Sequence, residues 1–118
     1  MIYAFPQYFN SKSRFLTYNV VAKALLAEGH IITDNVAESD AVLYSCCDVM
    51  DLKGLRELSR NTDKPIIAGG AYAFNYWSLT LYCDLVWIGE IYEMAELKTL
   101  EDINDSPHCY NGAEKDLY

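Results

Sequence analysis

Short apolar runs recur along the chain, and each one is bounded by a turn or a helical segment. Four of these runs are continuous instead of alternating with polar residues, at 2–5, 41–45, 65–68 and 85–88. Strands that are covered by helices on both faces have this pattern, as in parallel sheets. Ile31 and Ile32 form a shorter run, so the pattern predicts five strands in total.

The segments between the strands show the three- and four-residue spacing of amphipathic helices. The predicted inward face of the first helix consists of Phe15, Tyr18, Ala22, Leu25 and Leu26. Gly29 follows that helix as its terminating residue. A second helix begins at Asp51, and its predicted inward face consists of Leu52, Leu55 and Leu58. Residues 75–82 predict a short aromatic helix or an irregular segment, and residues 90–100 predict a further helix.

Strands that alternate with helices on short connections predict an α/β domain with a parallel sheet. Right-handed crossovers place helices on both faces of such a sheet, and five strands suit the flavodoxin-like, or Rossmann-like, order 2-1-3-4-5. The domain is expected at residues 1–103, and residues 104–118 are expected to be a C-terminal tail. The positions expected to be almost fully buried are Leu43, Ile66, Ile67, Val86 and Ile88.

The composition argues against two classes of partner, nucleic acids and membranes. The chain has 118 residues, and 9 basic against 17 acidic residues give a net charge of −8. Proteins that bind duplex nucleic acid gather Lys and Arg into a stripe, whereas here they are scattered, so we expect no direct nucleic-acid binding. No apolar run approaches the roughly 20 residues of a membrane span, and the first ten residues lack a basic region before an apolar stretch. We therefore expect a cytoplasmic protein with no membrane contact.

The four cysteines, Cys46, Cys47, Cys83 and Cys109, include no CxxC spacing and predict no metal site. A small thiol enzyme using the loop at residues 45–47 is one hypothesis, but it needs a base beside the thiol. His30 precedes the second strand at the opposite edge of the sheet, and His108 lies in the expected tail. No residue is therefore assigned a catalytic role.

Loops at the carboxyl ends of the strands are the expected place for a ligand, because open α/β sheets bind ligands there. Gly69 and Gly70 follow the fourth strand, and Gly89 follows the fifth. Glycine in such loops lets a ligand approach the backbone, and it also serves simple tight turns. The chain has neither GxGxxG after its first strand nor the P-loop pattern GxxxxGK[ST], so nucleotide binding by those routes is not expected.

Three segments together resemble a known family: SDAVLYSCC at 39–47, KPIIAGGAYAF at 64–74 and CDLVWIGEIYEMAEL at 83–97. They are similar to the cobalamin-binding domains that precede the catalytic barrel in many radical SAM enzymes. The resemblance implies cobalamin as the cofactor, held at the carboxyl edge of the sheet. The lining residues that it implies are Ser45, Gly69, Gly70, Ala71, Gly89 and Glu90.

The chain also departs from that family. It lacks the DxHxxG motif whose histidine ligates cobalt in the mutase-like branch, and it lacks the CxxxCxxC motif of the iron–sulfur cluster. The resemblance therefore implies no metal-ligating residue in this chain and no radical chemistry by the chain alone. On this interpretation it would be either a stand-alone relative of these domains, without the catalytic barrel, or a corinoid-binding subunit of a split system.

Aromatic residues are concentrated between the fourth and fifth strands, in AYAFNYWSLTLYC at 71–83. One helix face buries about half of such a set, and the remainder suits a contact with another protein. The interface residues that this predicts are Tyr72, Phe74, Tyr76 and Trp77. We therefore predict a non-catalytic binding or adaptor module with a protein partner or a second copy, and keep the corinoid-binding subunit and the thiol enzyme as alternatives.

Overall fold

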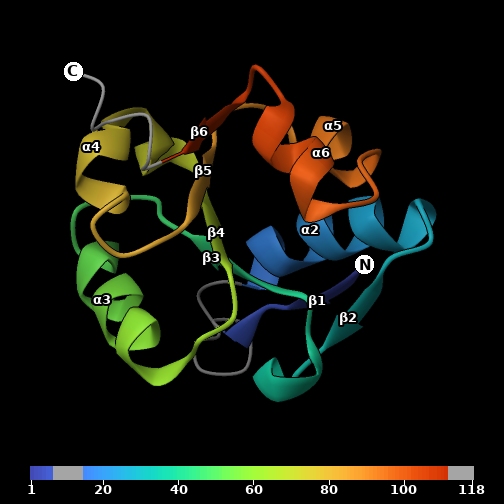
Figure 1. Ribbon diagram of the computed structural model, residues 1–118, viewed down its shortest axis with the longest axis horizontal. Coiled ribbons are helices and arrows are strands. Elements are labelled where there is room, and N and C mark those ends of the chain that lie inside the picture. The colour runs from blue at the N-terminus through green and yellow to red at the C-terminus, as the bar shows by residue number, and fades with distance from the viewer. Residues whose placement is uncertain (7–14, 112–118) are drawn as a thin grey trace.

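The computed structural model of the protein describes residues 1–6 and 15–111, with the side chains of 15–17 left aside. It shows a six-stranded sheet in the order β2-β1-β3-β4-β5-β6, with helices on both faces (Figure 1). The strands are β1 (Ile2–Ala4), β2 (Ile31–Thr33), β3 (Ala41–Ser45), β4 (Ile66–Gly69), β5 (Leu85–Trp87) and β6 (Cys109–Asn111). The first five strands are parallel and β6 pairs antiparallel with β5. The predicted α/β class and the order 2-1-3-4-5 are confirmed, and a sixth strand is added.

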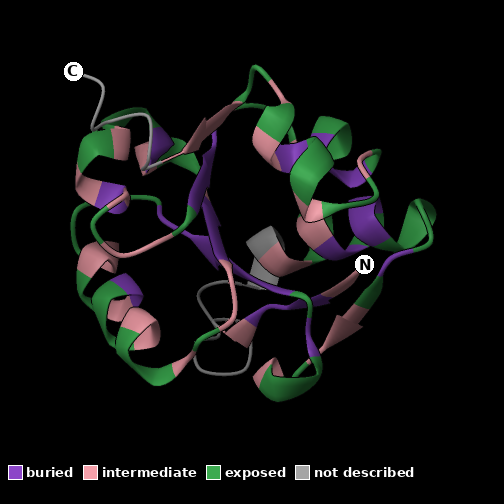
Figure 2. Cartoon of the chain, viewed as in Figure 1, coloured by how far each residue is buried: buried purple, intermediate pink, exposed green. Residues whose placement is uncertain are grey.

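The strands at the centre of the sheet are buried along their length, as their continuous apolar runs predict (Figure 2). All five residues of β3 are buried. Its register against β4 aligns Leu43 with Ile67 and Ser45 with Gly69, so these two strands end together at the carboxyl edge. This shared end is the frame on which the candidate site is built.

Two groups of helices cover the two faces of the sheet (Figure 1). One group consists of α2 (Phe15–Ala27), α5 (Ile91–Ala95) and α6 (Leu100–Asp105), and we call the face that it covers the α2 face. The other consists of α3 (Asp51–Asn61), the 3-10 helix η3 (Ala71–Asn75) and α4 (Tyr76–Leu79), and we call its face the α3 face. A short 3-10 helix, η2 (Val36–Glu38), precedes β3.

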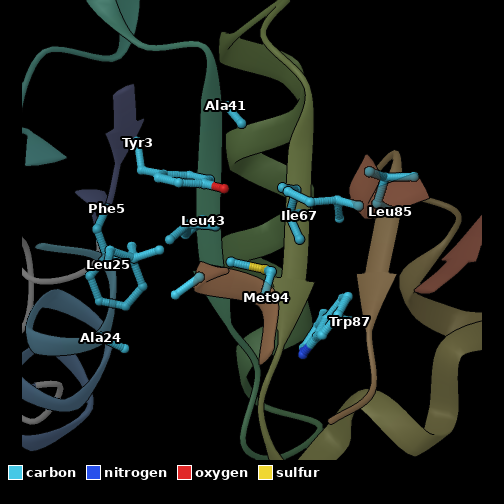
Figure 3. Close-up of a cluster of buried hydrophobic side chains, with 12 residues drawn as sticks. Tyr3, Phe5, Ala24, Leu25, Ala41, Leu43, Ile67, Leu85, Trp87 and Met94 are labelled. Carbon is cyan, nitrogen blue, oxygen red and sulfur yellow. The ribbon is translucent and has the colours of Figure 1, made fainter. Parts of the chain in front are cut away.

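The core is divided between these faces because side chains alternate along each strand. On the α2 face, Leu43, Ile67 and Trp87 from three successive strands pack with Leu25 of α2 and Met94 of α5 (Figure 3). The α3-face cluster consists of Ala4, Val42, Tyr44, Cys46, Leu55, Ile66, Ala68, Ala73, Leu79 and Val86. Four of the five predicted core positions, Leu43, Ile66, Ile67 and Val86, are buried as expected.

Ile88 is the exception, since it is only partly buried. It lies one residue beyond the end of β5, and its backbone N–H donates to the carbonyl of His108 at 2.8 Å. Leu26 also differs from the prediction, because 57% of its surface is exposed. The neighbouring Ala24 and Leu25 complete the inward face of α2 without it.

The helix predicted over 90–100 is two helices, and the predicted tail is partly built into the domain. Helix α5 ends at Ala95, and α6 begins after Thr99, whose hydroxyl accepts the backbone N–H of Asp102 at 3.1 Å. Helix α6 then reaches residue 105, and β6 adds residues 109–111 to the sheet. The prediction of a tail from residue 104 is therefore wrong for residues 104–111, while 112–118 lie outside the described residues.

No helix within the described part of the chain is long and apolar enough to cross a membrane.

Candidate functional site

A cavity of about 180 Å³ opens at the carboxyl ends of β3, β4 and β5, on the α2 face. Its inner walls are apolar and come from the sheet and from α2 and α5. The residues that line it are Phe5, Val21, Leu43, Tyr44, Ser45, Ile67, Gly69, Gly70, Trp87, Gly89, Ile91 and Met94. The wall that Phe5 forms, just beyond β1, lies next to the point between β1 and β3 where the strand order reverses, and open α/β sheets bind ligands at such a point.

Four of the six residues that the resemblance implies for a cofactor meet at this cavity: Ser45, Gly69, Gly70 and Gly89. The other two are not among its lining residues. Ala71 is exposed at the start of η3, and Glu90 is exposed just before α5. The carbonyl of Glu90 instead accepts the indole N–H of Trp87 at 3.1 Å, which fixes the ring that forms one cavity wall.

Two of these glycines are explained by local packing. Gly70 has φ 103°, and a Cβ there would lie 2.7 Å from the carbonyl oxygen of Cys46. A Cβ on Gly89 would lie 3.1 Å from Nδ1 of His108 and 3.4 Å from Nε1 of Trp87. Glycine at position 70 is therefore required by the backbone, and glycine at position 89 leaves room for the side chains of His108 and Trp87, with or without a ligand.

Gly69 differs from both. Its φ is not positive. Among the described residues other than its chain neighbours, the only heavy atom within 4 Å of a Cβ built on Gly69 is the carbonyl oxygen of Trp87, at the ordinary distance of 3.6 Å. Side chains alternate along a strand, so this Cβ would point to the same face as Ile67, which is the face of the cavity. The missing side chain of Gly69 therefore keeps space open in the cavity.

The loop after β3 forms one edge of the site and is held by Asp51. The carboxylate of Asp51 accepts the backbone N–H groups of Cys47 and Asp48 at 2.8 and 3.3 Å. Within this loop, Cys46 is buried and Cys47 is exposed, with its sulfur 3.6 Å from the hydroxyl oxygen of Ser45. Asp51 therefore has a structural role, because its carboxylate holds the backbone of the loop that leads into α3.

Both imidazoles in the chain are engaged away from these thiols. His30 contacts the Met1 amine through Nδ1 and the Ala95 carbonyl through Nε2, at 2.9 and 2.7 Å. His108 contacts the Ile88 carbonyl at 3.2 Å and the Glu93 carboxylate at 2.7 Å. None of the four cysteines, all of which the structure describes, forms a disulfide, and the described residues include no group of His, Cys, Asp or Glu that could hold a metal ion. The geometry therefore offers no support for the thiol-enzyme alternative.

The four predicted interface residues fall into two pairs. Phe74 and Trp77 are exposed, by 76% and 48%. Tyr72 and Tyr76 are partly buried against the α3-face cluster, and the ring of Tyr76 lies 4.0 Å from that of Tyr110 in β6.

Sequence reasoning missed part of the site. The inner walls of the cavity include Phe5, Trp87 and Met94, none of which was singled out. The available signal was that Phe5 and Trp87 are large aromatic residues at or just beyond the ends of buried strands. Leu81, an exposed residue within the aromatic stretch at 71–83, was also missed.

No family model, no curated protein and no solved structure matches this chain. Fold and site together define it as an α/β domain with a mostly parallel sheet of flavodoxin-like, or Rossmann-like, topology and an antiparallel strand at one edge.

Proposed function

We propose that this chain is a non-catalytic binding or adaptor module that acts through protein–protein contacts. One observation carries the proposal: Phe74, Trp77 and Leu81 are large apolar residues exposed by 76%, 48% and 65%. They follow one another at three- and four-residue steps, with Phe74 in η3, Trp77 in α4 and Leu81 in the turn after α4. We call these three residues the aromatic stripe, after its two aromatic members Phe74 and Trp77.

The fold does not use the aromatic stripe for its core. In the same segment, Ala73 and Leu79 are buried against the sheet and supply the inward side. Trp77 is nevertheless supported, because its ring lies 5.1 Å from that of Tyr76 and 5.7 Å from that of Tyr110. An ordered, exposed tryptophan in an apolar surrounding is typical of residues that dominate the binding energy of an interface.

Light scattering over a concentration series tests the version in which the partner is a second copy. The wild-type chain should increase in mean mass with concentration, and a Phe74→Ala, Trp77→Ala variant should stay monomeric. A Val20→Ala, Leu26→Ala variant is the matched control, because both side chains are exposed apolar residues on α2. A wild-type chain that stays monomeric at high micromolar concentration excludes self-association and restricts the proposal to a separate protein partner.

A corinoid-binding subunit is the second candidate, supported by the meeting of Ser45, Gly69, Gly70 and Gly89 at one cavity. The fit is incomplete. At about 180 Å³ the cavity is smaller than the roughly 300–1,000 Å³ of ordinary cofactor and drug-sized pockets. A whole corinoid does not fit inside it and would have to lie across the carboxyl edge.

Gel filtration of the chain with hydroxocobalamin tests this candidate. Retention of the corinoid with the protein, with a shifted visible spectrum, would support it, and the Gly69→Val variant should then lose the retained colour. Elution of all colour at the position of the free corinoid would exclude it. Neither result depends on the aromatic stripe.

A further inference from the structure

We propose that the cavity at the carboxyl edge is a binding site for a small, neutral molecule built on one aromatic ring or a small fused pair of rings. This goes beyond the adaptor function, and it holds whether or not the aromatic stripe binds a partner. The stripe belongs to the α3 face, while the cavity opens on the α2 face.

The size of the cavity limits the ligand. An apolar cavity of roughly 150 Å³ in another protein stays dry and binds benzene. The present cavity, at about 180 Å³, therefore suits one aromatic ring or a small fused pair such as indole. A larger ligand would have to leave most of its surface outside.

The chemistry of the walls limits the ligand further. None of the lining residues within the described part of the chain carries a charged side chain, and the inner walls are made by Phe5, Leu43, Ile67, Trp87 and Met94 (Figure 3). Burial of a charge among such groups without a partner is strongly unfavourable. Aromatic walls and the sulfur of Met94 instead give favourable contacts with an aromatic ring. The indole N–H of Trp87 is bonded to Glu90, so this wall presents an apolar surface.

Gly69 indicates that the space is not required by the fold. Its backbone conformation is open to other residues, and a Cβ would make only an ordinary contact. A larger side chain at this position would extend into the cavity, recover packing contacts and suit a strand better than glycine does. The chain therefore keeps a void that one substitution could fill, which is expected of a binding site.

Benzene and indole are the probes, and benzoate is the charged counterpart of similar size. Methyl NMR of the full chain should show saturable shifts at Leu43, Ile67 and Met94 with both neutral probes. Val42 and Leu55, which pack on the α3 face, should not shift. Benzoate should bind at least tenfold more weakly. At ten times its dissociation constant, benzene should raise Tm by roughly 4–8 °C.

Two variants at Gly69 and one control complete the test. Gly69→Val should abolish the shifts while the chain stays folded, and Gly69→Ala should weaken binding while keeping Tm within a few degrees of wild type. Should the valine variant not fold, the alanine variant and the methyl map decide. Phe74→Ala is the control and should bind benzene as the wild type does, because it changes only the aromatic stripe.

Three results would overturn the proposal. One is the absence of any saturable shift at Leu43, Ile67 and Met94 with either neutral probe. Another is equal binding of benzoate, which would contradict the apolar character of the site. The third is a set of shifts confined to the aromatic stripe and abolished by Phe74→Ala, which would assign the probe to a partner-binding surface instead.

Discussion

The two faces of the sheet leave apolar surface open in different ways. On the α2 face the opening is internal, as the cavity between the sheet and helices α2 and α5. On the α3 face the open apolar surface is on the outside, where the aromatic stripe of Phe74, Trp77 and Leu81 is exposed. An internal opening suits a small molecule, whereas an external stripe suits another protein, so we propose a different kind of binding for each face.

The difference has a cause in the covering helices. On the α3 face, α3 is 11 residues long, and Gly54 lets the hydroxyl of Tyr44 approach closely enough to donate to the carbonyl of Asp51 at 2.6 Å. This contact joins the helix to the centre of the sheet. On the α2 face, the carboxyl edge is covered in part by α5, which has only 5 residues. A short helix contributes few side chains, and the space beside Gly69 stays open.

The largest expected effect tests whether both helical layers are equally well packed away from the cavity. Leu25 in α2 and Leu55 in α3 are a matched pair, since both are fully buried leucines. Substitution of either by alanine should lower the free energy of unfolding by about 3–4 kcal/mol. Urea denaturation measures this, and Leu26→Ala on the exposed side of α2 should cost less than about 0.5 kcal/mol. A cost below about 1 kcal/mol at Leu25 alone would show that the α2 face is loosely packed throughout.

The next effect uses one titratable group from each face. Burial, and then the charge of Asp40, raises the pKa of Tyr3 on the α2 face from 10.0 to about 12. Burial, and then the charge of Asp84, raises the pKa of Cys83 on the α3 face from 9.0 to about 12. Both groups are neutral when protonated, so their contribution to folding is complete below the unfolded pKa and is lost as pH rises towards 12.

Stability should therefore fall from about pH 9 for Cys83 and from about pH 10 for Tyr3, by about 2–3 kcal/mol in the case of the fully buried Tyr3. Urea denaturation from pH 8 to pH 12 measures the loss. Tyr3→Phe should remove the part above pH 10, and Cys83→Ala should remove the part that begins near pH 9. An unchanged pH profile in both variants would contradict the assignment.

A smaller effect tests the contact that joins α3 to the sheet. A Cβ at Gly54 would overlap the hydroxyl of Tyr44, and such an overlap costs about 1–3 kcal/mol. Alanine also brings a gain of about 1 kcal/mol to a helix interior, so Gly54→Ala should destabilise the chain by at most about 2 kcal/mol net. In a Tyr44→Phe background the overlap is removed, and the same substitution should become neutral or stabilising. Additive effects in this double-mutant cycle would mean that the two residues do not interact.

The smallest effect concerns the break between α5 and α6 on the α2 face. Thr99→Ala removes the hydroxyl that accepts the N–H of Asp102 and should cost about 1 kcal/mol. Thr99→Ser keeps the hydroxyl and should stay within about 0.5 kcal/mol of wild type. Thermal unfolding of both variants measures the difference, and equal losses would show that the cap is not what begins α6.

Much of the fold follows from local pattern. The continuous apolar runs at 41–45 and 65–68 predicted buried parallel strands, because a strand covered on both faces has no polar side. Helix α3 was predicted from the spacing of its leucines, and the end of α2 from Gly29, which has φ 84°. Of the cofactor residues implied by the resemblance, Ser45 and the three glycines do meet at one edge, since parallel strands end together there.

Other features could not be predicted from the sequence, because they depend on residues that are distant along the chain. Residues 109–111 carry no strand pattern of their own, and they form β6 because β5 offers them a free edge and Tyr110 packs against Tyr76. The break between Ala95 and Leu100 lies inside a stretch whose apolar spacing continues, so only the cap at Thr99 reveals it. The exposure of Leu26 likewise reflects that Ala24 and Leu25 already fill the space beneath α2.

The sequence by itself determined the order of elements, the parallel character of the first five strands and the edge at which Ser45 and the three glycines meet. These depend on the periodicity and length of local segments, which neighbouring residues encode. Only the tertiary structure decided that Gly69 faces a void while Gly70 meets the Cys46 carbonyl, and that Phe74 and Trp77 face outward while Tyr76 packs inward. The physical reason is that a void and an exposed face are properties of several elements packed together, and no single segment encodes the volume that its neighbours leave unfilled.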